Sequence, residues 1–204
     1  MTEDFADLIT NNRFCVVGNS PKEVGTGNGP LIDSYDIVIR FKNYDTSEEF
    51  AADYGTKTDI WSTPFNQTQF YRDPAQYRAS LCCLPLNIPR WKMRFPRTNI
   101  DYPLLGKYEG IVQYIPFRIF EEVWHQYPVG QPSSGMITLY WIYKILGRPL
   151  NKKDMFGFSM FDPNEPHHYF LHKENDEKTE EWRISTPTTH PREMEMKVYE
   201  DIIK

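Results

Sequence analysis

Histidines near the end of the chain are the first candidates for acid–base chemistry. His190 stands immediately before Pro191, and a proline in the first turn of a helix predicts that His190 lies at or near the N-cap. The positive helix end disfavours an imidazolium, so His190 should be neutral near pH 7 and able to accept a proton. A general base needs this property, although a histidine that only caps the helix is an equal alternative.

His167 and His168 form an adjacent pair in front of Tyr169. Adjacent histidines on an extended segment point apart, and neither a helical His-x-x-x-His pair nor a nearby carboxylate completes a metal site around them. The pair therefore argues against a metal centre. A histidine that donates a hydrogen bond to a phosphate oxygen is the function that this segment favours.

Two hydroxyls and a glycine, Ser133, Ser134 and Gly135, stand at the start of the clearest apolar helix of the chain, 135–146. The pattern places Ser133 or Ser134 at the N-cap, with free N–H groups and the positive helix end facing outward. A phosphate group is stabilised at such an end. A plain serine cap without a ligand is the alternative interpretation.

An apolar, β-branched run from Phe14 to Val17 ends in a small polar turn of Gly18, Asn19 and Ser20. A run of this kind predicts a strand that is buried on both faces. In open α/β sheets, ligands bind at the turn after such a strand, because backbone N–H groups point into the crevice there. The later glycines of this stretch lie too far past the strand to complete a dinucleotide-binding fingerprint.

Short strands alternate with helical stretches along the chain, which predicts an α/β fold with a largely parallel sheet. The expected strands are 14–18, 37–41, 59–62, 81–86, 111–115 and 154–158. The expected helices are 47–54, 135–146 and 191–203, with a short helix or a loose arm over 1–12. The charged run 173–183 is typical of a solvated surface loop or helix.

Length and composition describe an ordinary soluble globule of one domain, 1–204. The net charge of −5 argues against non-specific binding to nucleic acid. No run approaches the roughly 20 apolar residues that a membrane helix needs, and the acidic N-terminus lacks the pattern of a signal peptide. The three cysteines are too few for a disulfide framework, so we expect a reducing, cytoplasmic setting.

A basic and aromatic cluster, RWKMRFPR at 90–97, interrupts the acidic composition. It is either a surface loop whose aromatic side chains fold back on the core, or a contact with an anionic acceptor or a membrane surface. The second alternative would make a cytoplasmic protein peripheral to the inner membrane.

Taken together, these segments resemble the animal-type sialyltransferases, which transfer sialic acid from CMP-sialic acid. Four motifs occur in the order of that family. The large motif is CVVGNS…LIDSYDIVIRFKN, the small motif is PSSGMITLYW…DMFGF, and the third motif is HHYF. The very small motif is a histidine followed five positions later by a glutamate, here His190 and Glu195. The resemblance covers nearly the whole chain, from about Phe14 to Glu195.

The resemblance implies a single Rossmann-like domain, a GT-A-like variant with a mostly parallel sheet flanked by helices. It implies inverting transfer of sialic acid to a hydroxyl of an acceptor glycan, without a metal or another cofactor. His190 would be the base that deprotonates the acceptor, and His168 would bind the donor phosphate. The implied donor and nucleotide contacts are Asn19, Ser20, Asn43, Ser133, Ser134 and Gly135.

The chain departs from the family pattern at several positions. The second nucleotide-binding asparagine of the family sits where this chain has Lys42, with Asn43 one place later, and both alternatives stay open. Gln131 replaces a tyrosine that often precedes the small-motif proline. Phe14 and Leu146 stand at the positions that a disulfide joins in secreted members, which favours apolar packing in a reducing compartment. The likeness therefore indicates a soluble, microbial member.

Two other functions fit parts of the same pattern. A transferase that uses another CMP-sugar, such as CMP-Kdo, would carry the same nucleotide half of the site. A nucleotide-binding module without catalysis would need neither His168 nor His190, so their presence argues against it. The expected partners are a CMP-sugar donor and an acceptor glycan, lipid-linked or part of a lipopolysaccharide, with no nucleic acid.

Overall fold

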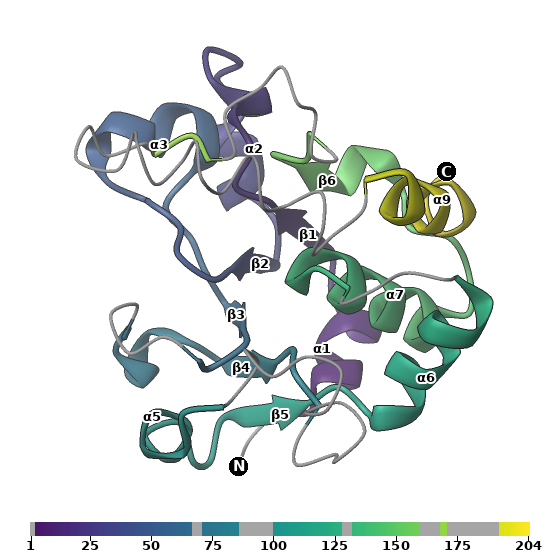
Figure 1. Ribbon diagram of the computed structural model, residues 1–204. Coiled ribbons are helices and arrows are strands. Elements are labelled where there is room, and N and C mark those ends of the chain that lie inside the picture. The colour runs from purple at the N-terminus through teal and green to yellow at the C-terminus, as the bar shows by residue number, and fades with distance from the viewer. Residues whose placement is uncertain (1–2, 67–70, 86–99, 128–131, 160–167, 171–191) are drawn as a thin grey trace, which may run out of the picture.

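One sheet with helices on both faces forms the fold seen in the computed structural model (Figure 1). The structure describes residues 3–66, 71–85, 100–127, 132–159, 168–170 and 192–204. Among the helices of these ranges, none combines the length and the apolar character needed to cross a lipid bilayer.

The sheet has six strands in the order β5-β4-β3-β2-β1-β6, and every pairing is parallel. The strands are β1 Phe14–Val17, β2 Ile37–Phe41, β3 Ile60–Thr63, β4 Ala79–Cys82, β5 Val112–Tyr114 and β6 Met155–Phe156. The chain adds strands outward from β1 to β5 and then returns to place β6 on the other side of β1. The order therefore reverses at β1, and open α/β sheets bind ligands at the carboxyl end of such a position.

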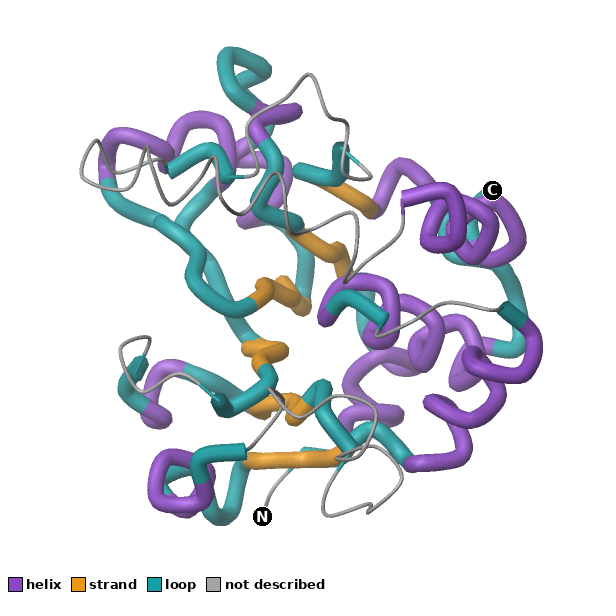
Figure 2. The backbone as a smooth tube through the Cα atoms, in the orientation of Figure 1, coloured by secondary structure: helices purple, strands orange, loops and turns teal. Residues whose placement is uncertain are grey.

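The helices fall into two groups, one on each side of the sheet (Figure 1). On one side lie α1 Phe5–Asn11, α6 Phe117–Gln126, α7 Ser134–Leu146 and α9 Arg192–Ile202. On the other lie α2 Gly29–Asp33, α3 Glu48–Tyr54 and α5 Tyr102–Gly106. Short 3₁₀ turns, η1 Pro21–Glu23, η3 Pro74–Gln76 and η4 Lys152–Asp154, occupy connections between strands and helices. The smooth backbone tube of Figure 2 shows this arrangement with the strands in orange.

Separate hydrophobic clusters cover the two faces of the sheet, because side chains alternate along each strand. On β2, Ile37, Ile39 and Phe41 join the larger cluster, which also contains residues of α1, α6, α7 and α9. Val38 belongs to a second cluster on the opposite face, together with residues of α2 and α3. The prediction of a strand buried on both faces also holds for β1, where Val16 and Val17 belong to different clusters.

Arg40 is the one charged residue of β2, and its side chain is fully buried on the face of α3. Its guanidinium donates to the backbone carbonyl of Tyr54 at 2.6 Å and to that of Lys57 at 3.0 Å. A cation beside the carboxyl end of a helix satisfies carbonyls that have no partner within the helix. Arg40 thus ties β2 to the end of α3.

The helix α7 begins and ends close to the predicted residues. Ser133 is its N-cap, and Gly147 ends it with a φ of +63°, a left-handed conformation that favours glycine. The first half of the helix is buried, while Trp141 and Tyr143 are only partly so and Lys144 is exposed. The apolar helix predicted from the sequence is therefore buried mainly over its first half.

Several elements differ from the sequence-based expectation. The strand expected over 81–86 begins earlier, as β4, and the strand expected over 154–158 is reduced to Met155–Phe156. Gly157 ends β6 because its φ of +66° turns the chain out of the sheet. The helices α2, α5 and α6 were not predicted from the sequence. The charged run 173–183 and the basic cluster 90–97 lie outside the described residues.

Phe14 and Leu146, at the positions matched to a disulfide in secreted relatives, both pack against the larger hydrophobic cluster. They also line the same small pocket, next to Leu150 and Met155. The three cysteines of the chain are free and buried. Apolar packing thus joins β1 to the end of α7, as the sequence suggested.

Candidate functional site

Two glycines bring the large and small motifs into backbone contact. A Cβ on Gly18 would lie 2.3 Å from the carbonyl oxygen of Gly157, and a Cβ on Gly157 would lie 2.5 Å from that of Gly18. The backbone N–H of Ser20 donates to the Gly157 carbonyl at 3.0 Å. Only residues without a side chain permit this approach, so the Asn19 turn is held directly against the end of β6.

Asn19 uses its side-chain amide to shape the chain that follows β2. Its Nδ2 donates to the carbonyl of Phe41 at 3.1 Å and to that of Asn43 at 2.8 Å. Lys42, between these carbonyls, has a φ of +46°, which is uncommon for a residue with a side chain. Both amide hydrogens of Asn19 are therefore occupied, whereas its Oδ1 is buried without a hydrogen-bond partner. Asn19 can thus still accept a hydrogen bond from a ligand.

Lys42 and Asn43 face different surroundings. Burial lowers the pKa of Lys42, and the neighbouring groups Cys83 and Glu195 oppose that shift. The Asn43 side-chain oxygen instead lies 3.5 Å from the guanidinium of Arg72. Of the two alternatives left by the sequence, Lys42 is the one that has Glu195 of α9 among its electrostatic neighbours.

Ser133 caps α7, and Glu195 of α9 binds the cap. The Ser133 Oγ accepts from the N–H of Met136 at 3.2 Å. Glu195 accepts from the Ser133 N–H and from its hydroxyl, both at 2.7 Å. The sequence predicted outward-facing N–H groups at this helix end, but that of Ser133 is occupied by a carboxylate of the protein itself. Asp and Glu are stabilised at such an end for the same reason as a phosphate.

Glu195 is 1% exposed, and its environment holds it near the point of half-protonation at neutral pH. Burial raises the pKa of its carboxyl to about 7, although the hydrogen bonds from Ser133 and the charge of Lys42 lower it. The carboxyl therefore changes charge in a range in which most glutamates stay ionised.

A buried polar layer lies beneath the start of α7. Burial raises the pKa of the Cys83 thiol, and the nearby hydroxyls of Ser134 and Ser62 lower it. The Ser62 hydroxyl is also 2.9 Å from that of Thr138, one turn along the helix from Ser134. Thr138 thus joins α7 to β3, and Ser134 lies close to Cys83, the residue after β4.

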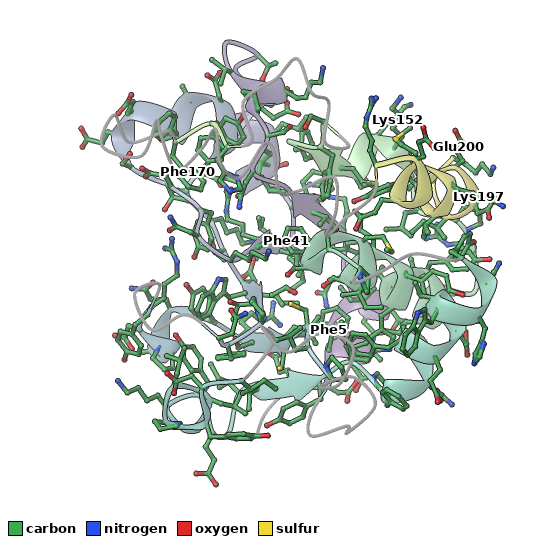
Figure 3. All side chains as sticks on the ribbon, in the orientation of Figure 1. Phe5, Phe41, Lys152, Phe170, Lys197 and Glu200 are labelled. Atoms are coloured by element: carbon green, nitrogen blue, oxygen red, sulfur yellow. The ribbon has the colours of Figure 1, made fainter. Side chains whose placement is uncertain are left out.

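Phe158 and Tyr199 lie next to Gly135, at the start of α7. A Cβ on Gly135 would lie 3.5 Å from the Phe158 ring and 3.8 Å from the Tyr199 hydroxyl, which is ordinary contact. The Phe158 ring meets Phe41 edge to face at 6.0 Å, and Phe41 lies between the sheet and α7 in Figure 3. These rings connect the end of β2 to the start of α7.

Tyr169 of the third motif fastens that motif to the Asn19 turn. Its backbone N–H donates to the Asn19 carbonyl at 2.9 Å, and its hydroxyl hydrogen-bonds to the backbone of Asp45. Its ring stacks on Tyr54 with centroids 3.7 Å apart. His168, the preceding residue, is therefore held next to the turn, where the sequence analysis expected the donor phosphate.

Seven of the residues that the sequence assigned to the donor site and its phosphate lie within the described part of the chain, at the carboxyl end of the sheet. These residues are Asn19, Ser20, Asn43, Ser133, Ser134, Gly135 and His168. Ser20 is 6% exposed, and its Oγ is buried without a hydrogen-bond partner. His190, His167 and Gln131 lie outside the described residues, so the position of the expected base stays a prediction.

Two contacts of this site could not be predicted from the sequence: the hydrogen bonds between Ser133 and Glu195, and the electrostatic interaction between Glu195 and Lys42. The sequence shows Glu195 in the last helix, but its spacing from other residues does not identify Ser133, 62 positions earlier, as its hydrogen-bond partner. The lysine was visible only as a departure from the family pattern.

Residues 9–77 match the family model described as glycosyltransferase family 29 (sialyltransferase), a stretch that includes β1, the Asn19 turn and Lys42. Over this stretch the chain is similar to the sialyltransferase family. Over 175 residues it is 29% identical to "CMP-N-acetylneuraminate-beta-galactosamide-alpha-2,3-sialyltransferase 1" of Sus scrofa, covering 80% of this chain and 48% of the relative. Over 189 residues it is 24% identical to the mouse protein numbered 2 in that series, covering 88% and 51%. The chain thus spans about half the length of the curated relatives it matches.

A solved structure described as "Crystal Structure of a Mammalian Sialyltransferase" has the same fold. The TM-score is 0.58 at 20% identity, and the match covers 94% of this chain and 68% of the mammalian one. The fold prediction, an α/β sheet of parallel strands flanked by helices in the manner of these transferases, is confirmed.

Proposed function

We propose that the protein transfers sialic acid from CMP-sialic acid to a hydroxyl of an acceptor glycan. The observation that carries the proposal is the meeting of three motifs at one end of the sheet. The Asn19 turn is hydrogen-bonded to Tyr169 of the third motif and packed against Gly157 of the small motif. The match of residues 9–77 to the sialyltransferase family model and the names of similar proteins support the donor, CMP-N-acetylneuraminate.

The reaction we infer is a single displacement with inversion at the anomeric carbon. His190 takes the proton of the acceptor hydroxyl as its oxygen attacks, and negative charge builds on the phosphate of the departing CMP. His168, held beside the Asn19 turn, donates to that phosphate and stabilises the charge. No step needs a metal ion or another cofactor, because proton transfer and charge stabilisation are assigned to side chains.

The geometry also suggests a different role toward the donor for each of the residues expected to contact it. The amide hydrogens of Asn19 are used within the protein, so this residue offers the nucleotide an acceptor, Oδ1, suited to a ribose hydroxyl. Ser20 offers a buried hydroxyl one residue later. The Ser133 side chain is engaged within the protein by Met136 and Glu195, so we assign Ser133 the role of placing the start of α7 near the cytidine.

A transferase for another CMP-sugar, such as CMP-Kdo, is the second candidate, because the nucleotide half of the site would be the same. The names of the relatives favour sialic acid. We further propose a cytoplasmic enzyme, or one peripheral to the inner membrane through 90–97, that acts on a glycan linked to lipid or lipopolysaccharide.

A comparison of the wild type with His190→Ala tests the function and the base together. We expect the variant to lose transfer from CMP-sialic acid while its affinity for CMP stays within about twofold, because the base contacts the acceptor rather than the nucleotide. Full turnover in the variant would refute the assignment of the base. Turnover of CMP-Kdo but not CMP-sialic acid by the wild type would favour the second candidate.

A further inference from the structure

Glu23 places a buried carboxylate at the end of the 3₁₀ turn η1, close behind the Asn19 turn. The side chain is 9% exposed, and the described part of the chain holds no cation within ion-pair distance of it. Its closest donors are the backbone N–H of Gly157, on Oε1, and the side-chain amide of Asn28, on Oε2, both at 2.8 Å. A buried charge is costly unless hydrogen bonds replace its water, so these two donors stabilise the carboxylate.

The Gly157 N–H lies beyond the ladder of the sheet. The strand β6 ends at Phe156, whose carbonyl accepts from the Gly18 N–H at 2.8 Å, and the positive φ of Gly157 then turns the chain away. The Gly157 carbonyl accepts from the Ser20 N–H at 3.0 Å, while Glu23 accepts from its N–H. Both backbone groups of this glycine are thus held by the same turn. Because a buried N–H without a partner is costly, the carboxylate fixes the point at which β6 leaves the sheet.

Tyr54 of α3 holds the other side of the same turn. Its hydroxyl donates to the Ser20 carbonyl at 2.6 Å and accepts from the Glu23 backbone N–H at 3.3 Å. Ser20 is therefore bonded to Gly157 through its N–H and to Tyr54 through its carbonyl, and Glu23 is bonded to the same two residues. The Glu23 carboxylate is the side-chain group that joins this turn to the end of β6.

The atoms that the turn can offer to a donor lie beside this contact. The Asn19 Oδ1 and the Ser20 Oγ are both buried without a hydrogen-bond partner. Phe158, the residue after the clamped glycine, packs on the other side, since a Cβ on Gly18 would lie 3.3 Å from its ring and one on Gly135 would lie 3.5 Å from it. A displacement of the end of β6 would thus shift the turn relative to the start of α7. A misplacement of about 1 Å is enough to remove much of the function of a site.

We propose that Glu23 is a positioning residue for the donor: its carboxylate holds Gly157 so that Asn19 and Ser20 face the nucleotide. The inference rests on the proposed function and deepens it, because Glu23 sets the affinity for the donor without touching it. Its hydrogen bonds lie in the donor half of the site, so its loss acts on donor binding rather than on the proton transfer assigned to His190.

A double-mutant cycle over Glu23 and Asn28 isolates these hydrogen bonds. In Glu23→Gln, one of the two contacts becomes donor against donor, whichever way the new amide is turned. In Asn28→Asp, two carboxylates face each other. In the double variant Glu23→Gln/Asn28→Asp, the new amide donates to the new carboxylate and its oxygen accepts from the Gly157 N–H, so both hydrogen bonds return. Glu49→Gln is the matched control, because Glu49 is an exposed glutamate of α3.

Each single variant should raise the Kd of CMP and the KM of CMP-sialic acid about 10-fold, the effect of one lost hydrogen bond to a buried group. The kcat should stay within about threefold of the wild type, because the base is untouched, and the double variant should recover the CMP affinity to within about threefold. Calorimetry measures the Kd and steady-state kinetics measure KM and kcat, on variants that circular dichroism shows to be folded. Glu49→Gln should change none of these values.

The other outcomes contradict the role of Glu23. Unchanged Kd and KM in the single variants, even with lower stability in urea, would leave Glu23 a part in folding only. A double variant as weak as the single ones would show that these hydrogen bonds do not set the affinity, and a loss of kcat at unchanged KM would place Glu23 in the chemical step. If Glu23→Gln does not fold, Asn28→Asp and the double variant must still show the loss and the recovery. A wild type that binds neither CMP nor CMP-sialic acid refutes the proposed function, whereas wild-type binding with unaffected variants refutes Glu23 alone.

Discussion

Glu195→Gln should change the pH dependence of stability in a way that the burial of Glu195 dictates. The substitution preserves the shape of the protonated carboxyl and an oxygen that can accept from the Ser133 N–H, but it removes the charge. The pKa of the carboxyl is about 7 in the folded protein, against a value of 4.5 for an unburied glutamate. The folded state therefore binds more protons than the unfolded chain between these two values, so the wild type loses stability as the pH rises through this range.

The size of the effect follows from the shift. A pKa difference of about 2.5 between the two states corresponds to about 3 kcal/mol, at 1.36 kcal/mol for each pKa unit. The free energy of unfolding of the wild type, relative to that of Glu195→Gln, should therefore fall by about 3 kcal/mol from pH 4.5 to above pH 7. Subtracting the free energy of unfolding of Glu195→Gln from that of the wild type removes the contributions of all other titrating groups, because the two proteins share them.

Urea unfolding of both proteins at several pH values between 4.5 and 8 measures this difference. Glu200→Gln is the matched control for the loss of one acidic residue from α9, since Glu200 is exposed on that helix (Figure 3). A difference between wild type and Glu195→Gln that stays constant with pH, or that changes in the opposite direction, would refute the description of Glu195 as a buried carboxyl with a raised pKa.

Three further substitutions probe the assembly of the site. Gly18→Ala should unfold the protein or destabilise it by several kcal/mol, because its Cβ would lie 2.3 Å from the Gly157 carbonyl oxygen. Gly106→Ala is the control, because the space around Gly106 is open, and its thermal unfolding should be nearly that of the wild type. Tyr169→Phe should lower turnover more than CMP affinity, since the hydroxyl anchors the third motif to Asp45 and thereby places His168; equal stability and unchanged turnover would argue against that anchor. His168→Ala should reduce turnover about 100- to 1000-fold, the usual loss for one donor to a developing negative charge, and a change below tenfold would exclude the phosphate contact.

The sequence predicted the elements whose pattern is local. The β-branched run that forms β1 and the serine and glycine that bound α7 are sufficient signals by themselves. The helix α6 was missed because no side chain caps it and only Ile119, Phe120 and Val123 of its ten residues are buried. The length of β6 depends on the contact of Gly157 with Gly18, which lies far away in the sequence.

The same distinction holds for the site. Asn19, Ser133 and His168 were found because a turn, a cap and a paired histidine are local patterns, and the structure places all three at one end of the sheet. The hydrogen bonds from Ser133 to Glu195 join residues that no spacing relates. The left-handed conformation of Lys42 depends on the Asn19 amide 23 positions earlier in the chain, so a lysine in the sequence could not reveal it.

The most direct test of the central claim is the release of CMP from CMP-sialic acid by the purified protein in the absence of an acceptor. A CMP-sialic acid-dependent transferase with the site described above should hydrolyse the donor slowly, with water in the place of the acceptor hydroxyl, and EDTA should leave the rate unchanged. A protein that binds CMP but leaves CMP-sialic acid intact, with or without acceptor glycans, would contradict the proposed transfer of sialic acid.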